Sequence, residues 1–321
     1  MDNINKLIIF LPALNEEEKI KDVILTLPNK IVGIDEIFIL VIDDGSTDQT
    51  ASLASEAGAH VISHGYNRGL GIVFQGAIRY ALENQADILV TIDADGQFDP
   101  GFIPELIKPI QLGNAQLVTG NRFVSGRPKN MARIKYWGNK QISRLVRIVS
   151  GQELQDVSCG FRAYSSEALY HLNLFGTFSY THETILDLVY KGFSVMEIPI
   201  SVKYYPERKS RIVSSISGYA FNTSKIIFRT MLDYKPLRFF GTLGALNLLI
   251  GFVFVGYMLG NYLLSGAFTP YKSFGFIGLG FGVFGLIILF IGLVADMLNR
   301  IRINQDRILY TLRKGNIKVE Q

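Results

Sequence analysis

Cysteine is almost absent from this chain of 321 residues, whose only one is Cys159. A single cysteine excludes a disulfide within the chain, is typical of a reducing compartment and is expected here as a small buried residue. A strong net charge is also missing, since 32 lysines and arginines stand against 28 aspartates and glutamates. The net charge of +4 favours no nucleic-acid partner. We expect no secretory signal either, because the first apolar run, Leu7–Leu11, is short and flanked by Asp2 and Lys6.

Charged side chains almost disappear between Phe239 and Ala295, where Lys272 is the only one. Two apolar segments lie there, at 237–264 and 273–295, and each exceeds the ~20 residues that cross ~30 Å of hydrocarbon. Because the connecting turn is short, we expect a hairpin of two transmembrane helices with both ends on one side. Glycines in both segments would allow close helix contacts or contacts within an oligomer.

The distribution of basic residues predicts the orientation of this hairpin. Six of them follow the second segment: Arg300, Arg302, Arg307, Arg313, Lys314 and Lys318. Since the turn holds only Lys272, the positive-inside rule places the catalytic domain, both termini and a basic tail at 297–321 in the cytoplasm, with the hairpin in the plasma membrane. Residues 212–236 have amphipathic helical spacing. This pattern fits juxtamembrane helices on a membrane surface, and it equally fits a helix packed on its own domain.

The first two-thirds of the chain alternates strand-like apolar runs with helical patterns. The expected strands are 7–11, 37–42, 60–63, 88–92 and 117–119, and the expected helices are 15–27, 47–57 and 71–84. This alternation predicts an α/β fold with a mostly parallel sheet covered by helices. We expect Asn15 to cap the first helix, and Ser46 or Thr47 to cap the second.

Polar residues gather where three of these strands end. They are Pro12 to Glu16 after the first strand, Asp43-Asp44 after the second, and Asp93-Ala94-Asp95 after the fourth. One such cluster is explained by strand termination and helix capping. Three at the carboxyl edge of one sheet favour a ligand site, because ligands of open α/β sheets bind there.

Asp93 and Asp95 are spaced so that both carboxylates can face one hard cation. Gln97 can add a carbonyl oxygen. Oxygen ligands of this kind suit Mg²⁺ or Mn²⁺ bound to a diphosphate, where the metal would act as a Lewis acid on a departing nucleoside diphosphate. An isolated D-x-D occurs often by chance, and its place after a buried strand makes it informative.

Six segments occur in order: PALNEE, VIDDGSTDQT, NRGLG, DADGQFDP, GNRF and DVSCGFRAY. Together they resemble family 2 of the glycosyltransferases, in the branch of dolichol-phosphate mannose synthases and polyprenyl-phosphate (bactoprenol) glucosyltransferases. The resemblance covers roughly residues 6–211, and the hairpin extends it to most of the chain. It implies a Rossmann-like GT-A catalytic domain over 1–211 and inverting transfer of a sugar from a nucleotide-sugar to a polyprenyl phosphate.

The resemblance also implies roles for individual residues. The nucleotide-sugar pocket would comprise Pro12, Leu14, Glu16, Ile42, Asp44, Asp93, Ala94 and Arg208. The metal would be held by Asp93, Asp95 and Gln97, and the acceptor phosphate by Arg122, Arg133 and Arg211. Asp156 would approach the acceptor and Glu183 the sugar, so that Asp95, Asp156 and Glu183 form the catalytic set. The stretch from Arg208 to Arg211 is shorter than the family's pattern and lacks its glycine, which leaves both arginines' roles open.

The chemistry of the acceptor limits what Asp156 does. A phosphate monoester has a second pKa of about 6 and is largely dianionic at neutral pH. Such a nucleophile needs little help from a general base. We therefore expect Asp156 to position the acceptor or stabilise positive charge on the sugar. The basic stretch from Arg127 to Arg147 fits either a solvated helix face or a surface for anionic headgroups.

Several alternatives stay open. Resemblance to the two-span bacterial subgroup favours UDP-glucose, and a mannose synthase that uses GDP-mannose is the second hypothesis. A membrane-anchored, non-catalytic scaffold that binds sugar nucleotides is the third. A processive polysaccharide synthase is disfavoured because Gln141 lacks the Arg-Trp of its Q-x-x-R-W motif. The family makes a homo-oligomer plausible, with four subunits as one expectation. His64, His171 and His182 lack metal-type spacing and are interpreted as structural or as residues that support the ligands of a site.

Overall fold

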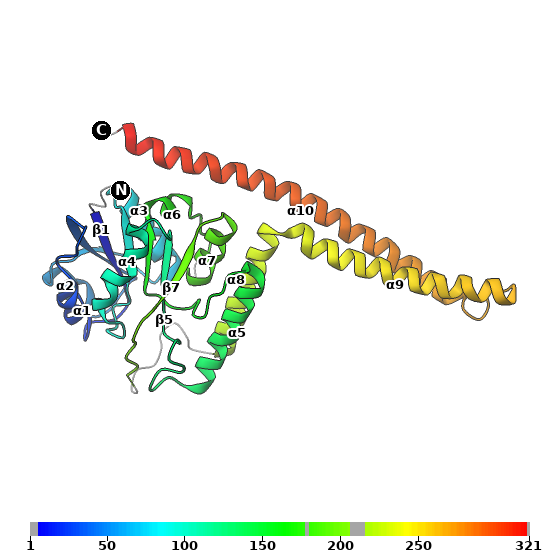
Figure 1. Cartoon of the computed structure of the whole chain (residues 1–321), viewed down its shortest axis with the longest axis horizontal. Coiled ribbons are helices and arrows are strands. Elements are labelled where there is room, and N and C mark those ends of the chain that lie inside the picture. The colour runs from blue at the N-terminus through cyan, green and yellow to red at the C-terminus, as the bar shows by residue number, and fades with distance from the viewer. Residues whose placement is uncertain (1–5, 177–179, 206–215, 320–321) are drawn as a thin grey trace. The chain divides into compact units, whose positions relative to one another are not determined.

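The computed structural model describes residues 6–176, 180–205 and 216–319 (Figure 1). By their contacts they form two units, Met1–Phe228 with Tyr310–Gln321, and Arg229–Leu309. The strands are β1 Lys6–Ala13, β2 Glu36–Asp43, β3 His60–Ser63, β4 Ile88–Thr91, β5 Leu117–Asn121, β6 Arg162–Ser165 and β7 Val195–Pro199. The helices are α1 Ile20–Thr26, α2 Thr50–Glu56, α3 Leu70–Glu83, the short 3-10 turn η1 Pro100–Phe102, α4 Ile103–Gln111, α5 Arg133–Ser150, α6 Ser166–His171, α7 Thr181–Tyr190, α8 Ile216–Tyr234, α9 Pro236–Ser265 and α10 Lys272–Val319.

The first unit is built on one seven-stranded sheet with the order β3-β2-β1-β4-β6-β5-β7. Neighbouring strands run parallel except at β6, which is antiparallel to both β4 and β5. The expected mostly parallel sheet is confirmed. Because β1 and β4 lie side by side near its centre, the segments that follow them leave the sheet at the same edge.

Helices cover both faces of this sheet (Figure 1). Successive side chains of β1 alternate between two core clusters: Leu7 and Ile9 pack with residues of α1 and α4, and Ile8 and Phe10 with residues of α3 and α7. These four side chains are fully buried, and each such burial contributes about 1.5–3 kcal/mol. Burial on both faces explains why β1 is a continuous apolar run instead of an alternating one.

The expected cap of the first helix was wrong. Helix α1 begins at Ile20, and Asn15 instead adopts φ +53° in the turn before it. Asparagine tolerates this left-handed conformation better than most residues. The Asn15 side chain accepts a hydrogen bond from the backbone N–H of Thr47, and the backbone N–H of Asn15 donates to Ser46 Oγ. The two residues expected to cap α2 therefore join two loops, and α2 begins later, at Thr50.

The second unit contains α9 and most of α10. Glycines bring the two helices together: a Cβ on Gly251 would lie 2.7 Å from the oxygen of Gly278, and one on Gly285 would lie 2.9 Å from the oxygen of Gly244. The expected hairpin of two apolar helices is therefore seen in the structure. Helix α10 does not end near Ala295 but continues to Val319, so much of the expected tail is helical. Helix α8 lies within the segment expected to be amphipathic.

Candidate active site

Strand β4 delivers Asp93, Ala94 and Asp95 to the carboxyl edge of the sheet. Asp93, Asp95 and Gln97 are half-buried, and Ala94 between them is buried. The N–H of Gln97 donates to Asp95 Oδ1 at 2.9 Å, and Gly96 adopts φ +71°, so the loop turns back on itself. Among the described residues no three His, Cys, Asp or Glu gather as metal ligands. The oxygen donors present, two accessible carboxylates and an amide, fit Mg²⁺ or Mn²⁺.

A second loop packs tightly against this one. A Cβ on Gly160 would lie 3.0 Å from Asp93 Oδ1, and side chains rarely tolerate such an approach. Glycine at position 160 therefore lets the loop from Asp156 to Gly160 lie this close to the Asp93 carboxylate, which a side chain at 160 would have to displace. The fold thus places the D-A-D segment next to the D-V-S-C-G segment, although the first aspartates of the two segments are 63 positions apart.

Arg122, which directly follows β5, forms a buried ion pair with Asp156 of this second loop. Arg122 Nε donates to Asp156 Oδ2 at 2.7 Å, Arg122 Nη2 donates to Asp156 Oδ1 at 2.8 Å, and the Arg122 N–H donates to the same carboxylate at 3.1 Å. The Asp156 side chain is fully buried and that of Arg122 is 9% exposed. Burial acts to lower the pKa of Arg122, but the charge of Asp156 and its hydrogen bonds, with further contributions from Cys159 and Tyr204, together raise the pKa well above its usual value. The two residues predicted to face the acceptor therefore face each other.

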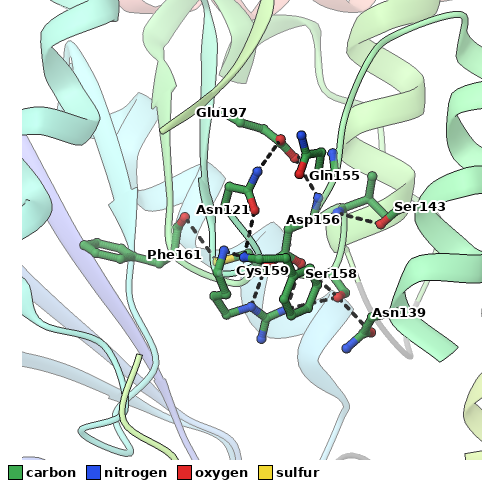
Figure 2. A network of polar contacts seen from close by, with 12 residues as sticks. Asn121, Asn139, Ser143, Gln155, Asp156, Ser158, Cys159, Phe161 and Glu197 are labelled. Carbon is green, nitrogen blue, oxygen red and sulfur yellow. Dashed lines mark hydrogen bonds and ion pairs between the residues drawn. The ribbon is translucent and has the colours of Figure 1, made fainter. Parts of the chain in front are cut away.

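Polar side chains surround this pair on two sides. Arg122 Nη2 also donates to Ser158 Oγ, which donates in turn to Asn139 Oδ1 on α5 (Figure 2). On the other side Arg122 Nη1 donates to the Tyr204 hydroxyl at 3.2 Å. All the nitrogens of the Arg122 side chain thus have partners within the protein. Its orientation is set before any ligand arrives.

Tyr204 connects the ion pair to the D-A-D loop and to α5. The ammonium group of Lys135, on α5, lies 5.3 Å from the centre of the Tyr204 ring. The backbone N–H of Lys203 donates to the backbone carbonyl oxygen of Gln97 at 2.9 Å, so the segment that carries Tyr204 lies against the D-A-D loop. Burial lowers the pKa of Lys135, and the charge of Arg122 adds to this, whereas the charges of Asp95 and Asp93 oppose it. Neither Lys135 nor Tyr204 was among the predicted site residues.

Asp44 closes a further loop at the same edge of the sheet. Its carboxylate accepts hydrogen bonds from the N–H groups of Arg68 and Gly69, both at 2.9 Å, and lies 2.9 Å from His64 Nδ1. Gly69 adopts φ +94° and immediately precedes α3. The buried carboxylate of Asp44 therefore ties the segment before α3 to the end of β2, with His64 as one of its partners.

The remaining predicted site residues lie around this edge or outside the described part of the chain. Pro12 is half-buried near the end of β1, Leu14 and Glu16 are half-buried in the segment that follows, and Ile42 is buried in β2. Glu183, in the first turn of α7, accepts hydrogen bonds from the N–H groups of Phe175 and Gly176. Arg133 is exposed at the start of α5. Arg208 and Arg211 fall outside the described residues.

Arg162 is a buried cation that sequence reasoning did not single out, although it lies in the FRAY segment. Its guanidinium is 0% exposed and donates to the oxygens of Cys159, Thr181 and Val157 at 2.6–2.8 Å, and to Thr184 Oγ1 at 2.9 Å. It thereby joins the Asp156–Gly160 loop to α7. Cys159 is buried as expected, and burial raises the pKa of its thiol to about 12.

A match to a family model gives this site its class. Residues 8–172 match the model of glycosyl transferase family 2. The chain belongs to this family and is a glycosyltransferase. The mostly parallel sheet, with helices on both faces, is the expected GT-A fold.

The proteins that resemble the chain include two curated enzymes and one solved structure that bear on its substrates. It is 29% identical to the polyprenol monophosphomannose synthase of Mycolicibacterium smegmatis, covering 66% of this chain and 81% of that protein. It is also 29% identical to a UDP-N-acetylglucosamine–dolichyl-phosphate N-acetylglucosaminyltransferase of Methanococcus voltae, covering 70% and 94%. Glucosyl-3-phosphoglycerate synthase from Mycobacterium tuberculosis, solved with Mn²⁺, uridine-diphosphate-glucose and phosphoglyceric acid, superposes with a TM-score of 0.55 at 25% identity, covering 70% and 80%.

Proposed function

We propose that this glycosyltransferase moves a hexose from a nucleotide-sugar to a polyprenyl phosphate, with inversion at the sugar. The observation that carries the proposal is the packing of Gly160 against Asp93. It brings a pair of carboxylates suited to a cation beside the loop whose Asp156 orients Arg122, and Arg122 Nη1, which donates one N–H to Tyr204, keeps a second N–H that can donate to a phosphate. This combination suits a transfer between two phosphorylated molecules, since each phosphate can meet a positive charge. The names of the polyprenol and dolichyl-phosphate relatives support the lipid acceptor.

Asp93, Asp95 and Gln97 would hold a divalent cation in this reaction. When bound, Mg²⁺ or Mn²⁺ supplies Lewis-acid stabilisation of the leaving nucleoside diphosphate. The Mn²⁺ in the similar synthase supports a divalent ion. The segments around Pro12 and Asp44 would bind the nucleoside, because they lie at the same sheet edge as the D-A-D loop. Glu183, on α7, would lie on the sugar side.

The acceptor would attack with its own phosphate oxygen. A bond forms between this oxygen and the anomeric carbon of the sugar, while the bond from that carbon to the nucleoside diphosphate breaks. Arg122 and Arg133 would orient the attacking phosphate, and Lys135 adds positive charge nearby. Asp156 would act by holding Arg122, since its carboxylate already accepts three hydrogen bonds from that residue.

A membrane location follows from the lipid acceptor and from two features of the chain. Helices α9 and α10 are long and apolar enough to cross a membrane, and only 11% and 17% of their most apolar windows are buried. Soluble core helices of this length are mostly buried instead. Helix α5 also exposes an apolar row at helical spacing, Ile134, Trp137, Leu145 and Ile148, beside basic residues. Such a helix suits the surface of an anionic membrane.

We further propose a plasma-membrane enzyme with two spans and with the catalytic domain and both termini in the cytoplasm. The domain boundaries expected from the sequence belong to this proposal. A homo-oligomer also stays part of it, although Gly251 and Gly278 are used within the hairpin itself. Cross-linking in native membranes would count the subunits.

The donor sugar is tested most directly by a panel of nucleotide-sugars offered to the detergent-solubilised full chain with undecaprenyl phosphate. UDP-glucose is the favoured donor. GDP-mannose is the second candidate, because one relative is named a monophosphomannose synthase. Each reaction is run with Mg²⁺ or Mn²⁺, and radiolabelled sugar is measured in the butanol-extractable lipid. Absence of labelled lipid with every donor would refute the proposed function.

A matched pair of variants separates a catalyst from a scaffold that only binds sugar nucleotides. We expect Asp95→Asn to reduce transfer by about 100-fold or more, because several kcal/mol of charge stabilisation depends on the metal. Asp99→Asn is the control, since this exposed aspartate on the same loop only caps η1. Equal activity of the two variants would contradict the metal site.

A further inference from the structure

Glu197 occupies a junction behind the ion pair of Arg122 and Asp156. It is a half-buried residue of β7, next to β5 in the sheet. Its Oε1 accepts hydrogen bonds from the N–H groups of Gln155 and Asp156, at 2.8 and 2.7 Å. Its Oε2 accepts from Asn121 Nδ2 at 2.9 Å (Figure 2). One carboxylate thus holds the segments that carry both members of the pair.

Asn121 passes this connection to the backbone around Arg122. Asn121 Oδ1 accepts from the N–H of Phe123 at 2.9 Å, and the N–H of Arg122 itself donates to Asp156. Two consecutive backbone N–H groups are therefore held by side chains that depend, directly or through Asn121, on Glu197. Asn121 is 4% exposed, so little water is present to replace a lost partner.

The hydrogen bonds that connect Phe123, Asn121 and Glu197 allow only one orientation of the Asn121 side-chain amide. Both Glu197 oxygens accept, so Asn121 must turn its amide nitrogen toward Glu197 and its oxygen toward Phe123. A glutamine at 197 that keeps its oxygen on the two backbone N–H groups would set its own NH₂ against that of Asn121. Turning Asn121 over would only move the clash to the Phe123 N–H. A neutral residue of the same shape therefore breaks the connection.

We infer that Glu197 and Asn121 are positioning residues for the acceptor phosphate, which they serve by fixing the orientation of the Arg122–Asp156 pair. The inference rests on the proposed role of Arg122 in binding that phosphate. The described hydrogen bonds of Glu197 are made to Asn121, Gln155 and Asp156. None of these three residues is proposed to bind the nucleotide-sugar. Loss of Glu197 should therefore affect the acceptor and leave the nucleotide-sugar unaffected.

The test compares Glu197→Gln with the exchange of both groups, Asn121→Asp together with Glu197→Gln. In the double variant the carboxylate introduced at position 121 accepts from the new glutamine amide and from the Phe123 N–H, so every donor again meets an acceptor and the net charge is kept. We expect Glu197→Gln to raise KM for polyprenyl phosphate about tenfold, as loss of one hydrogen bond to a charged group predicts. KM for the nucleotide-sugar should stay unchanged, and the exchange should restore the acceptor KM.

Glu153→Gln is the control for the loss of one negative charge. Glu153 lies three positions before Asp156 in the sequence, but its side chain is 87% exposed. Melting temperatures are recorded for every variant. A Glu197→Gln protein with a lower melting temperature but an unmoved acceptor KM would show a structural role only and overturn the inference, and so would equal rises in both KM values. If Glu197→Gln does not fold, a double variant that folds with the wild-type acceptor KM supports the inference, and one that also fails overturns it. Wild-type chain that makes no labelled lipid would instead overturn the proposed function.

Discussion

The ion pair of Arg122 and Asp156 allows a quantitative prediction. Asp156→Ala leaves a nearly buried guanidinium without its counter-ion, since the Arg122 side chain is 9% exposed. Breaking a buried pair from one side costs about 3–5 kcal/mol. Asp156→Asn keeps the shape and one accepting oxygen but sets an NH₂ against an Arg122 N–H. Loss of one hydrogen bond to a charged group costs about 1.5–3 kcal/mol.

A double-mutant cycle with Arg122→Met isolates the pair. Each single variant leaves one buried charge unpaired, whereas Arg122→Met with Asp156→Ala leaves none. The two effects should therefore be less than additive, with a coupling free energy of about 2–3 kcal/mol. Thermal unfolding of the full chain followed by circular dichroism measures this. For a unit of this size about 2–4 °C corresponds to 1 kcal/mol, so Asp156→Ala should melt about 10 °C lower than wild type.

Activity of the same variants tests the role of Asp156. If it holds Arg122, Asp156→Asn should keep more transfer activity than Asp156→Ala. The ratio should stay constant between about pH 6 and 9, because neither variant loses a general base and the ionisation of the phosphate affects both alike. Additive stability effects, within about 0.5 kcal/mol, would refute the pairing argument. Equal and complete loss of activity in both variants throughout this pH range would instead assign Asp156 the role of a general base.

Three further predictions concern residues around the site. Tyr204→Phe removes the hydroxyl that accepts from Arg122 but keeps the ring beside Lys135. It should raise the KM for the acceptor less than Tyr204→Leu does. Identical steady-state kinetics of the two variants would contradict a role for the Tyr204 ring. Arg162→Lys cannot reach the four acceptors of the guanidinium; it should lower the free energy of unfolding by about 3 kcal/mol in thermal melts, and a loss under about 1 kcal/mol would count against this role. Burial and the nearby charge of Arg162 together lower the pKa of His182 to about 3, although the charge of Asp156 acts to raise it. Because the unfolded chain binds a proton below about pH 6.5 that the folded chain excludes, stability should fall on acidification toward pH 3 by up to about 1.4 kcal/mol per pH unit. His182→Asn should flatten this dependence in melting curves, and an unchanged slope would reject it.

The sequence alone was sufficient to predict features that depend on local pattern. Apolar runs and their spacing predicted the mostly parallel sheet, and the scarcity of charged residues between Phe239 and Ala295 predicted the two apolar helices. Placement of the D-A-D segment at the end of a buried strand was likewise correct, because strand ends are marked by the change from apolar to polar residues. These properties are determined by neighbours in the chain.

The partners of the site residues were decided only by the tertiary structure. Arg122 and Asp156 are 34 positions apart, and they meet because β5 and β6 are adjacent in a sheet whose strand order does not follow the chain. Asn15 has the composition of a helix cap but joins two loops, since Ser46 and Thr47 lie within hydrogen-bond distance of it. Glu197 had one sequence signal, a lone acid in an apolar strand. Its meaning appeared only when the fold placed β7 beside β5, because hydrogen bonds join groups that are close in space, however distant they are along the chain.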